Sequence, residues 1–180
     1  MRRALTIGLP TLLLGLLCQA ATLERLSLDE MTQKSTAIVR GRVTGSFTTQ
    51  HGSMIYTHYR LDVSERWKGG DTAVAGVVVP GGVAGGLRQA FAGVPRLAAG
   101  REYVLFLWTG PSGLTHLIGL SQGVFNLSRD AGGDWTAYRP ACAEVMLDKD
   151  GTPVHDQAVT LRLSDLRQRV GSGVQTGGRK

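Results

Sequence analysis

Cysteine is scarce in this chain of 180 residues, which has only Cys18 and Cys142. We expect Cys18 to be removed with an N-terminal signal, which leaves Cys142 alone. One cysteine cannot form an intramolecular disulfide, and it offers no C-x-x-C pair for zinc. The domain must therefore be stabilised by its hydrophobic core, and we expect Cys142 to be a buried residue without a chemical role.

The chain also lacks a concentration of positive charge. Its formal net charge is +6, and no run of three basic residues occurs. The charge falls to about +4 without Arg2 and Arg3, and to about +2 without the terminal Arg179 and Lys180. A folded domain with so small a charge does not have the basic surface that nucleic-acid binding requires. We therefore expect no nucleic-acid partner.

Long hydrophobic runs are missing from all but the N-terminal end. There, two arginines precede an apolar stretch from Ala4 to Leu17 that glycine and proline interrupt, and small residues follow at 18–21. This is the pattern of a secretory signal peptide, whereas a membrane-spanning helix needs about 20 apolar residues. We expect residues 1–21 to be removed, leaving a periplasmic or secreted protein without a membrane span.

Strand patterns dominate the rest of the chain. Residues 37–47 and 55–67 each alternate apolar and polar side chains, and the turn residues between them predict a hairpin. This alternation places Phe47 on the apolar face of its strand. Residues 101–108 are apolar on both faces, which predicts a central strand, and 135–139 form a shorter strand pattern.

Helix signals are confined to the two ends of the predicted domain, residues 22–170. Ser27 and Glu30 have the spacing of a capping box, and the last helix is expected to begin near Ser164 and stop at Gly171. We expect residues 171–180 to be a disordered tail. The fold class is therefore mainly β: a small, partly closed antiparallel barrel of the OB-like kind with a short N-terminal helix and a C-terminal helix. The alternative architecture is a β-sandwich.

A G-x-S-x-G motif at residues 119–123 raises the question of a catalytic Ser121. A nucleophile elbow needs a strand, a tight turn and then a helix, whereas strand patterns lie on both sides of Ser121. The pattern predicts a kinked or bulged strand, and we expect no catalytic residue. The alternative is a serine hydrolase that uses Ser121 with His155 and an aspartate such as Asp148.

A glycine-rich stretch at residues 80–96 offers a different kind of site. It lacks the G-K-[ST] ending of a phosphate loop, so we expect a mobile surface loop that binds a partner. The four histidines show no metal-binding motif, and we expect no metal or cofactor. The alternative is a metal site assembled across strands by His58, His116 and Cys142. The residues we expect to bind the partner are Pro80, Gly81, Gly82, Arg88 and Arg96.

Several short motifs resemble those of a family of exported bacterial domains of uncharacterised function. They are STAIVRGRVTG, LDVSERWKGG, Pro80-Gly81-Gly82, Gly93-Val94-Pro95, GREYVLFL and GLSQGVFNL, within residues 23–127. In that setting the glycines around Ser121 imply a structural turn. The AIVRGRV stretch also resembles the netrin and metalloproteinase-inhibitor type of OB-like barrel. Those inhibitors reach the protease zinc with an N-terminal cysteine, which this chain lacks, so only the fold carries over.

These observations favour a non-enzymatic binding or accessory module of the cell envelope. We expect it to bind protein through the 80–96 segment and the exposed strand faces. The expected partner is a secreted protease or another envelope protein.

Overall fold

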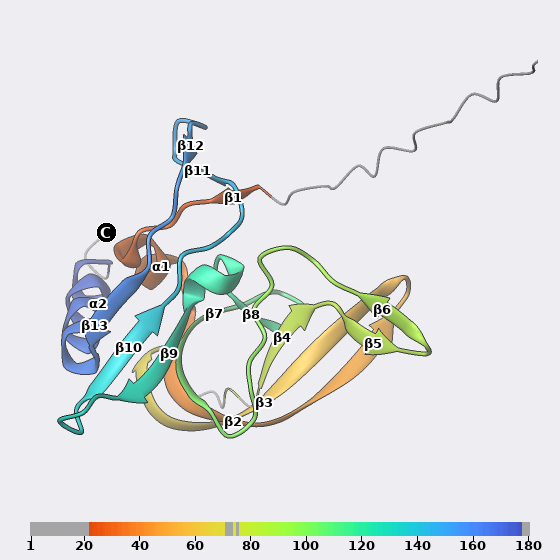
Figure 1. The fold of residues 1–180 in the computed structure, drawn as a ribbon, viewed down its shortest axis with the longest axis horizontal. Helices are drawn as coiled ribbons and strands as arrows, with labels where there is room; N and C mark the ends of the chain where they lie inside the picture. Colours follow the sequence, from red (N-terminus) through yellow and green to blue (C-terminus); the bar gives the residue numbers. More distant parts are fainter. Residues whose placement is uncertain (1–21, 71–73, 75, 178–180) are drawn as a thin grey trace, which may run out of the picture.

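The computed structural model describes residues 22–70, 74 and 76–177. The predicted signal peptide and the last three residues lie outside this part of the chain. The elements are β1 (Leu23–Glu24), α1 (Leu28–Lys34), β2 (Ala37–His51), β3 (Met54–Lys68), β4 (Gly76–Pro80), β5 (Gly82–Ala84), β6 (Leu87–Gln89), β7 (Glu102–Thr109), β8 (Thr115–Leu117), η1 (Leu120–Gly123), β9 (Val124–Arg129), β10 (Trp135–Arg139), β11 (Met146–Leu147), β12 (Pro153–Val154), β13 (Val159–Arg162) and α2 (Leu163–Gly177) (Figure 1).

One sheet of eight strands organises the molecule, in the order β13-β10-β9-β7-β2-β3-β4-β8. Its β7 strand also pairs with β8, so that the β7-β2-β3-β4-β8 portion closes on itself. All of these pairings are antiparallel except that of β4 with β8, where Val78 lies opposite His116. The predicted class is therefore confirmed at the level of a mainly β fold whose main sheet partly closes into a ring.

The predicted hairpin of β2 and β3 is confirmed, but its register corrects the placement of Phe47. The pairing shifts at three points along β2, the last between Val43 and Gly45. A bulge inserts one extra residue, so the side chains beyond it change faces. Phe47 is consequently 44% exposed, whereas Val43 before the shift is buried.

The central β7 strand separates two hydrophobic cores, as its two-sided apolar pattern predicts. Its odd-numbered residues Tyr103, Leu105 and Leu107 face a core enclosed by the ring. Its even-numbered residues Val104 and Phe106 face a second core, which the two helices cover. Because successive side chains of β7 point to opposite faces, this one strand contributes to the core of the ring and to the core that the two helices cover.

The C-terminal helix is longer than the sequence predicts. It passes through Gly171 and ends at Gly177, so residues 171–177 are helical and not a disordered tail. Val170 is buried in the second core and Val174 packs against it, which extends the helix by one apolar turn. A Cβ at Gly173 would lie 3.1 Å from Thr32 Cγ2, so this glycine lets α2 lie close to α1.

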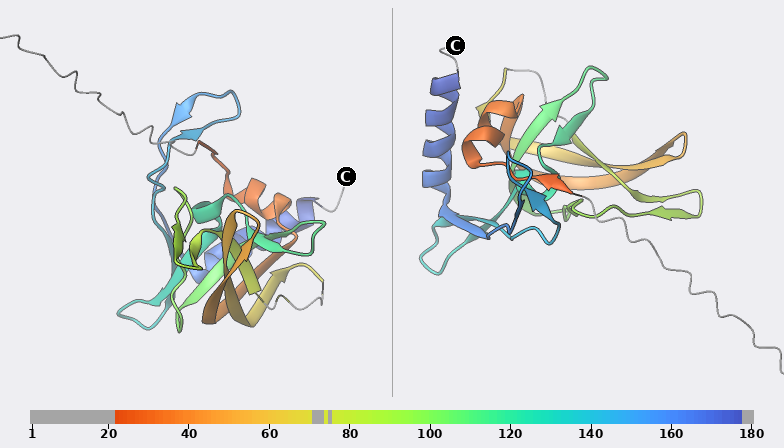
Figure 2. Two further views of the ribbon diagram at one scale, coloured as in Figure 1. Left: turned by 90° about the vertical axis from the view of Figure 1, so that its right-hand side faces the viewer. Right: turned by 90° about the horizontal axis from the view of Figure 1, so that it is seen from above.

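The segment expected to be a mobile loop, residues 80–96, contains a β-hairpin instead. Residues of β5 pair with β6 across a two-residue Gly85-Gly86 turn, in which both glycines have positive φ. This backbone is the one that tight hairpins prefer, and glycine adopts it without steric cost. The β5–β6 hairpin lies at the opposite end of the molecule from the two helices (Figures 1 and 2).

Candidate functional site

All five residues predicted to bind a partner line one cleft of about 490 Å³, which we name the arginine cleft. Its walls come from the β2–β3 hairpin, the end of β4, the β5–β6 hairpin and the 90–97 segment. The remaining lining residues are Ser46, Thr57, Tyr59, Val79, Val83, Gln89, Ala90, Phe91, Val94, Pro95 and Leu97. Several stretches that are separate in the sequence therefore form a single concave surface.

The two glycines of the cleft hold the chain close against β2 and β3. Thr57 Oγ1 donates to the carbonyl of Gly81 at 2.7 Å, and Thr48 Oγ1 donates to that of Val83 at 2.7 Å. At Gly82, where φ is +141°, a Cβ would lie 2.7 Å from Thr57 Oγ1 and 2.8 Å from Thr48 Cγ2. Gly82 is thus required by close packing as well as by backbone conformation.

Gln89 joins the β5–β6 hairpin to the tip of the β2–β3 hairpin. Its Oε1 accepts from the Ile55 amide at 2.7 Å, and its Nε2 donates to the Ser53 carbonyl at 2.6 Å. Sequence reasoning missed this residue, since an amide that bonds a backbone more than thirty positions away leaves no local pattern. These hydrogen bonds fix the position of the β5–β6 hairpin, which forms one wall of the cleft.

The cleft carries positive charge that no other residue in the described part of the chain neutralises. Arg88 and Arg96 are exposed, and neither side chain has a hydrogen bond or ion pair with any residue in the described part of the chain. No aspartate or glutamate is among the residues that line the cleft. An anionic group that enters it therefore meets two guanidinium groups and no opposing carboxylate.

Apolar side chains accompany these two arginines. Val83 and Phe91 line the cleft and are 59% and 43% exposed, and Leu87 is exposed nearby on β6. Exposed apolar groups clustered beside unpaired charge are typical of a surface that binds a partner. The arrangement suits a ligand with carboxylates and apolar side chains, such as an acidic segment of protein.

The geometry around Ser121 differs from that of a nucleophile elbow. Instead of the expected bulged strand, a single 3-10 turn, η1, carries Ser121, and strand β9 follows directly. The positive φ angles fall at Gly119 and Leu120 and not at the serine. Ser121 Oγ lies 3.0 Å from Cys142 Sγ, and within the described residues it has no hydrogen bond to a histidine or carboxylate.

The other two residues of the alternative hydrolase lie in different settings. Asp148 accepts hydrogen bonds from the amides of Asp150 and Thr152 within the turn between β11 and β12. His155 is exposed. No hydrogen bond in the described chain joins either residue to Ser121, so no relay of the Ser-His-Asp kind is assembled.

The neighbours of Cys142 form a structural ion pair. Arg139 donates two hydrogen bonds to the Asp156 carboxylate, at 2.6 and 3.0 Å, and the Cys142 amide donates a third at 2.9 Å. Burial raises the pKa of Asp156, but these bonds and the positive charge of Arg139 outweigh it and hold this pKa at about 2. Cys142 is half-buried, and burial raises the pKa of its thiol, so it is protonated at neutral pH.

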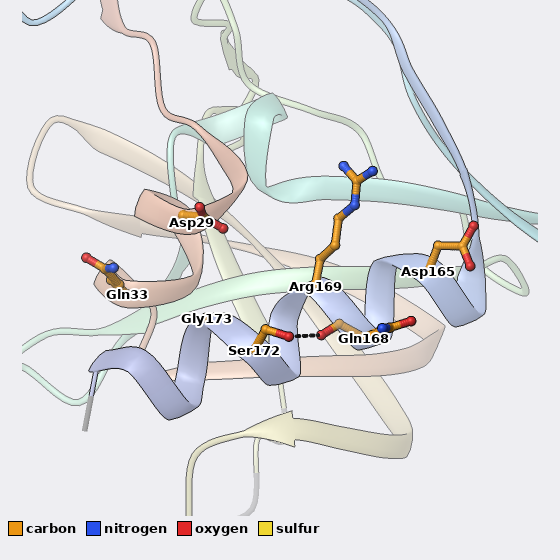
Figure 3. Close-up of a pocket in the computed structure, with 7 residues that line it drawn as sticks. All are labelled: Asp29, Gln33, Asp165, Gln168, Arg169, Ser172 and Gly173. Atoms are coloured by element: carbon orange, nitrogen blue, oxygen red, sulfur yellow. Dashed lines mark hydrogen bonds between the residues drawn. The ribbon is translucent and has the colours of Figure 1, made fainter. Parts of the chain in front are cut away.

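Two further hollows carry less distinctive chemistry. A groove between α1 and α2 is lined by polar and charged side chains, among them Asp29, Gln33 and Arg169 (Figure 3). The second hollow, of about 650 Å³, is lined by residues of β2, β3 and β4, among them Phe47 and His58, and by residues 113–115. There the Phe47 ring already stacks on His58, and the guanidinium of Arg60 lies 5.2 Å from the ring centroid, so the ring is engaged by residues of this protein.

The described residues hold no group of three or more His, Cys, Asp or Glu side chains placed to bind a metal ion. The alternative trio of His58, His116 and Cys142 therefore does not come together in the fold. No helix among the described residues is both long and apolar enough to cross a membrane.

Comparison with known proteins gives no family for this chain. No protein-family model matches it, and no curated protein does.

Proposed function

We propose that this protein is an exported, non-enzymatic binding module of the cell envelope that holds an acidic segment of another protein in the arginine cleft. The observation that carries the proposal is a pair of arginines, without a partner among residues 22–70, 74 and 76–177, in a cleft that no carboxylate lines. Buried or paired arginines serve the protein's own stability, whereas exposed and unpaired ones beside apolar groups are available to a partner. A secreted protease or another envelope protein is the proposed source of that segment.

We further propose that the closed part of the sheet is an OB-like barrel in preference to a β-sandwich. Three features support this: the ring has five strands, its pairings run β2-β3-β4-β8-β7-β2, and one of them is parallel. A sandwich packs two separate sheets face to face, whereas here the strands enclose one core within a ring. The barrel would provide a rigid base for the cleft.

Photo-crosslinking in the native envelope tests the proposed function. A photoreactive amino acid at Phe91 should crosslink to a partner, and mass spectrometry should identify an acidic segment at the junction. Replacing both arginines, Arg88→Ala with Arg96→Ala, should reduce the crosslink at least tenfold, since the charge pairing is lost. Tyr138 is the matched control position, because it is equally exposed but lies outside the cleft. A crosslink from Phe91 that does not depend on the arginines contradicts the proposal.

A fluorophosphonate probe tests the non-enzymatic part of the proposal separately. Ser121 has no hydrogen-bonded base within the described residues, so its hydroxyl should not be labelled. Labelling of the wild type that is absent from Ser121→Ala would instead favour the serine hydrolase.

A further inference from the structure

The β5–β6 hairpin presents an unpaired strand edge beside the arginine cleft. In a hairpin with a two-residue turn, the pair next to the turn is hydrogen-bonded and the following pair is not. Ala84 and Leu87 are the first pair here, and Val83 and Arg88 are the second. The backbone groups of Val83 and Arg88 therefore point away from each other, toward the two outer edges of the hairpin.

The two outer edges have different surroundings. The Val83 carbonyl accepts a hydrogen bond from Thr48 Oγ1, so the edge of β5 is turned to β2. Among the described residues, β6 pairs with β5 and with no other strand. Backbone groups on one edge recur at every second residue, so those of Arg88 lie on the free side of β6, which ends at Gln89. If an added strand extended β6 by one residue, the backbone groups of Ala90 would fall on the same side. These amides and carbonyls are available to an added strand.

We propose that the partner's acidic segment binds as an extended strand along the free edge of β6. Its backbone would pair with that of Arg88 and Ala90, while its carboxylates meet the side chains of Arg88 and Arg96. Such strand addition uses main-chain hydrogen bonds for affinity and alternate side chains for specificity. The inference rests on the proposed function and adds the conformation of the bound segment.

Charge selects an acidic segment over a second copy of this protein. If two β6 edges paired around a two-fold axis centred on this short strand, Arg88 of one molecule would lie opposite Arg88 of the other. Like charges directly opposite each other in a ladder are destabilising, and no carboxylate lines the cleft to offset them. A strand that alternates acidic and apolar residues would instead place carboxylates near both arginines and apolar groups near Leu87 and Phe91.

The probe for this inference is a synthetic peptide of eight residues that alternates glutamate and valine. Amide hydrogen exchange of the purified protein is followed by NMR with and without the peptide, and a lysine–valine peptide is the matched control. The glutamate peptide should bind, and exchange at the Arg88 and Ala90 amides should slow at least tenfold, because both amides become hydrogen-bonded. The amide of Leu87, already paired with Ala84, is the internal reference.

The outcomes separate the two proposals. Binding that needs Arg88 and Arg96 but leaves exchange at the Arg88 and Ala90 amides unchanged overturns strand addition alone. Failure of the glutamate peptide to bind, or equal binding of the lysine peptide, overturns the acidic preference of the cleft and with it the proposed function. As an independent check, peptides N-methylated at alternate amides should differ at least tenfold in affinity, because only one edge of the added strand faces β6.

Discussion

Two pairs of arginines in this protein differ in what surrounds them. At the end nearer the helices, Arg40 bonds Glu65 and Glu102 at 2.7 Å each, and the largely buried Arg139 is held by Asp156. At the β5–β6 end, Arg88 and Arg96 have no partner in the described chain. A guanidinium satisfied by its own fold contributes to stability, whereas an exposed one without a carboxylate contributes little to folding. The comparison thus assigns stability to the first pair and leaves the second pair free for the partner binding that we propose.

The largest expected effect is that of breaking the ion pair between Arg139 and Asp156. Arg139→Ala leaves the Asp156 carboxylate, whose side chain is only 3% exposed, without its counter-charge. Removing one partner of a buried pair typically costs about 3–5 kcal/mol. Urea denaturation should show a loss of that size. A loss below about 1 kcal/mol, the range of exposed pairs, would remove the distinction between the two pairs of arginines.

A smaller loss is expected from Gly82→Ala in the cleft wall. The added Cβ would contact Thr57 and Thr48, and alanine would be strained at a φ of +141°. The cost should be about 1–3 kcal/mol in the free energy of unfolding. Gly45→Ala is the control, since Gly45 lies on β2 with nothing within 4 Å of the added Cβ. Equal effects of the two substitutions would contradict the close packing of the cleft wall on β2 and β3.

The ion pair also predicts how stability depends on pH. The pKa of Asp156 is lowered from 3.8 to about 2 in the folded protein, so its contribution is complete above pH 4 and is lost as the pH falls toward 2. Glu30 titrates in the same range, because hydrogen bonds with Lys149 and Ser27 lower its pKa to about 2. Acid titrations are therefore best compared in a Glu30→Gln background. There, Asp156→Asn should flatten the stability curve between pH 4 and 2, and an unchanged slope would refute the assignment.

The smallest effect on stability is expected at the cleft arginines themselves. Arg88→Ala and Arg96→Ala remove exposed side chains that have no partner among the residues the structure describes, so each should change the free energy of unfolding by no more than about 0.5 kcal/mol. Thermal denaturation at constant salt measures this directly. A loss comparable with that of Arg139→Ala would mean that these residues serve the fold.

Local patterns in the sequence predicted the β2–β3 hairpin, the two-sided β7 strand and the mainly β class. Each of these predictions depends on how apolar and polar residues follow one another over a few positions. The corresponding segments do form strands in the structure. The exposure of Phe47 could not be predicted from the alternation in β2. The shifts that turn its side chain to the other face arise in the pairing of β2 with β3. The β5–β6 hairpin did have a local signal in Gly85-Gly86, but its strands are three residues long and show no periodicity.

For the proposed site, the sequence indicated residues that line one cleft of the structure, but not how they are arranged. Pro80, Gly81, Gly82, Arg88 and Arg96 were selected as members of a glycine-rich segment with basic residues, and the fold gathers them in one cleft. The absence of carboxylates from its lining and the hydrogen bonds of Gln89 arise from contacts between distant segments. The approach of Ser121 to Cys142, 21 positions apart in the sequence, also left no local pattern.

The central claim is that the unpaired arginines of the cleft bind an acidic partner and do not stabilise the fold. The most direct measurement is the affinity of the glutamate–valine peptide for the double variant Arg88→Ala/Arg96→Ala, compared with a control double variant, Arg162→Ala/Arg169→Ala. The control removes the same charge from β13 and α2, at the other end of the molecule (Figure 1). We predict at least tenfold weaker binding for the cleft variant and less than twofold change for the control. Equal affinities for the two variants would contradict the account.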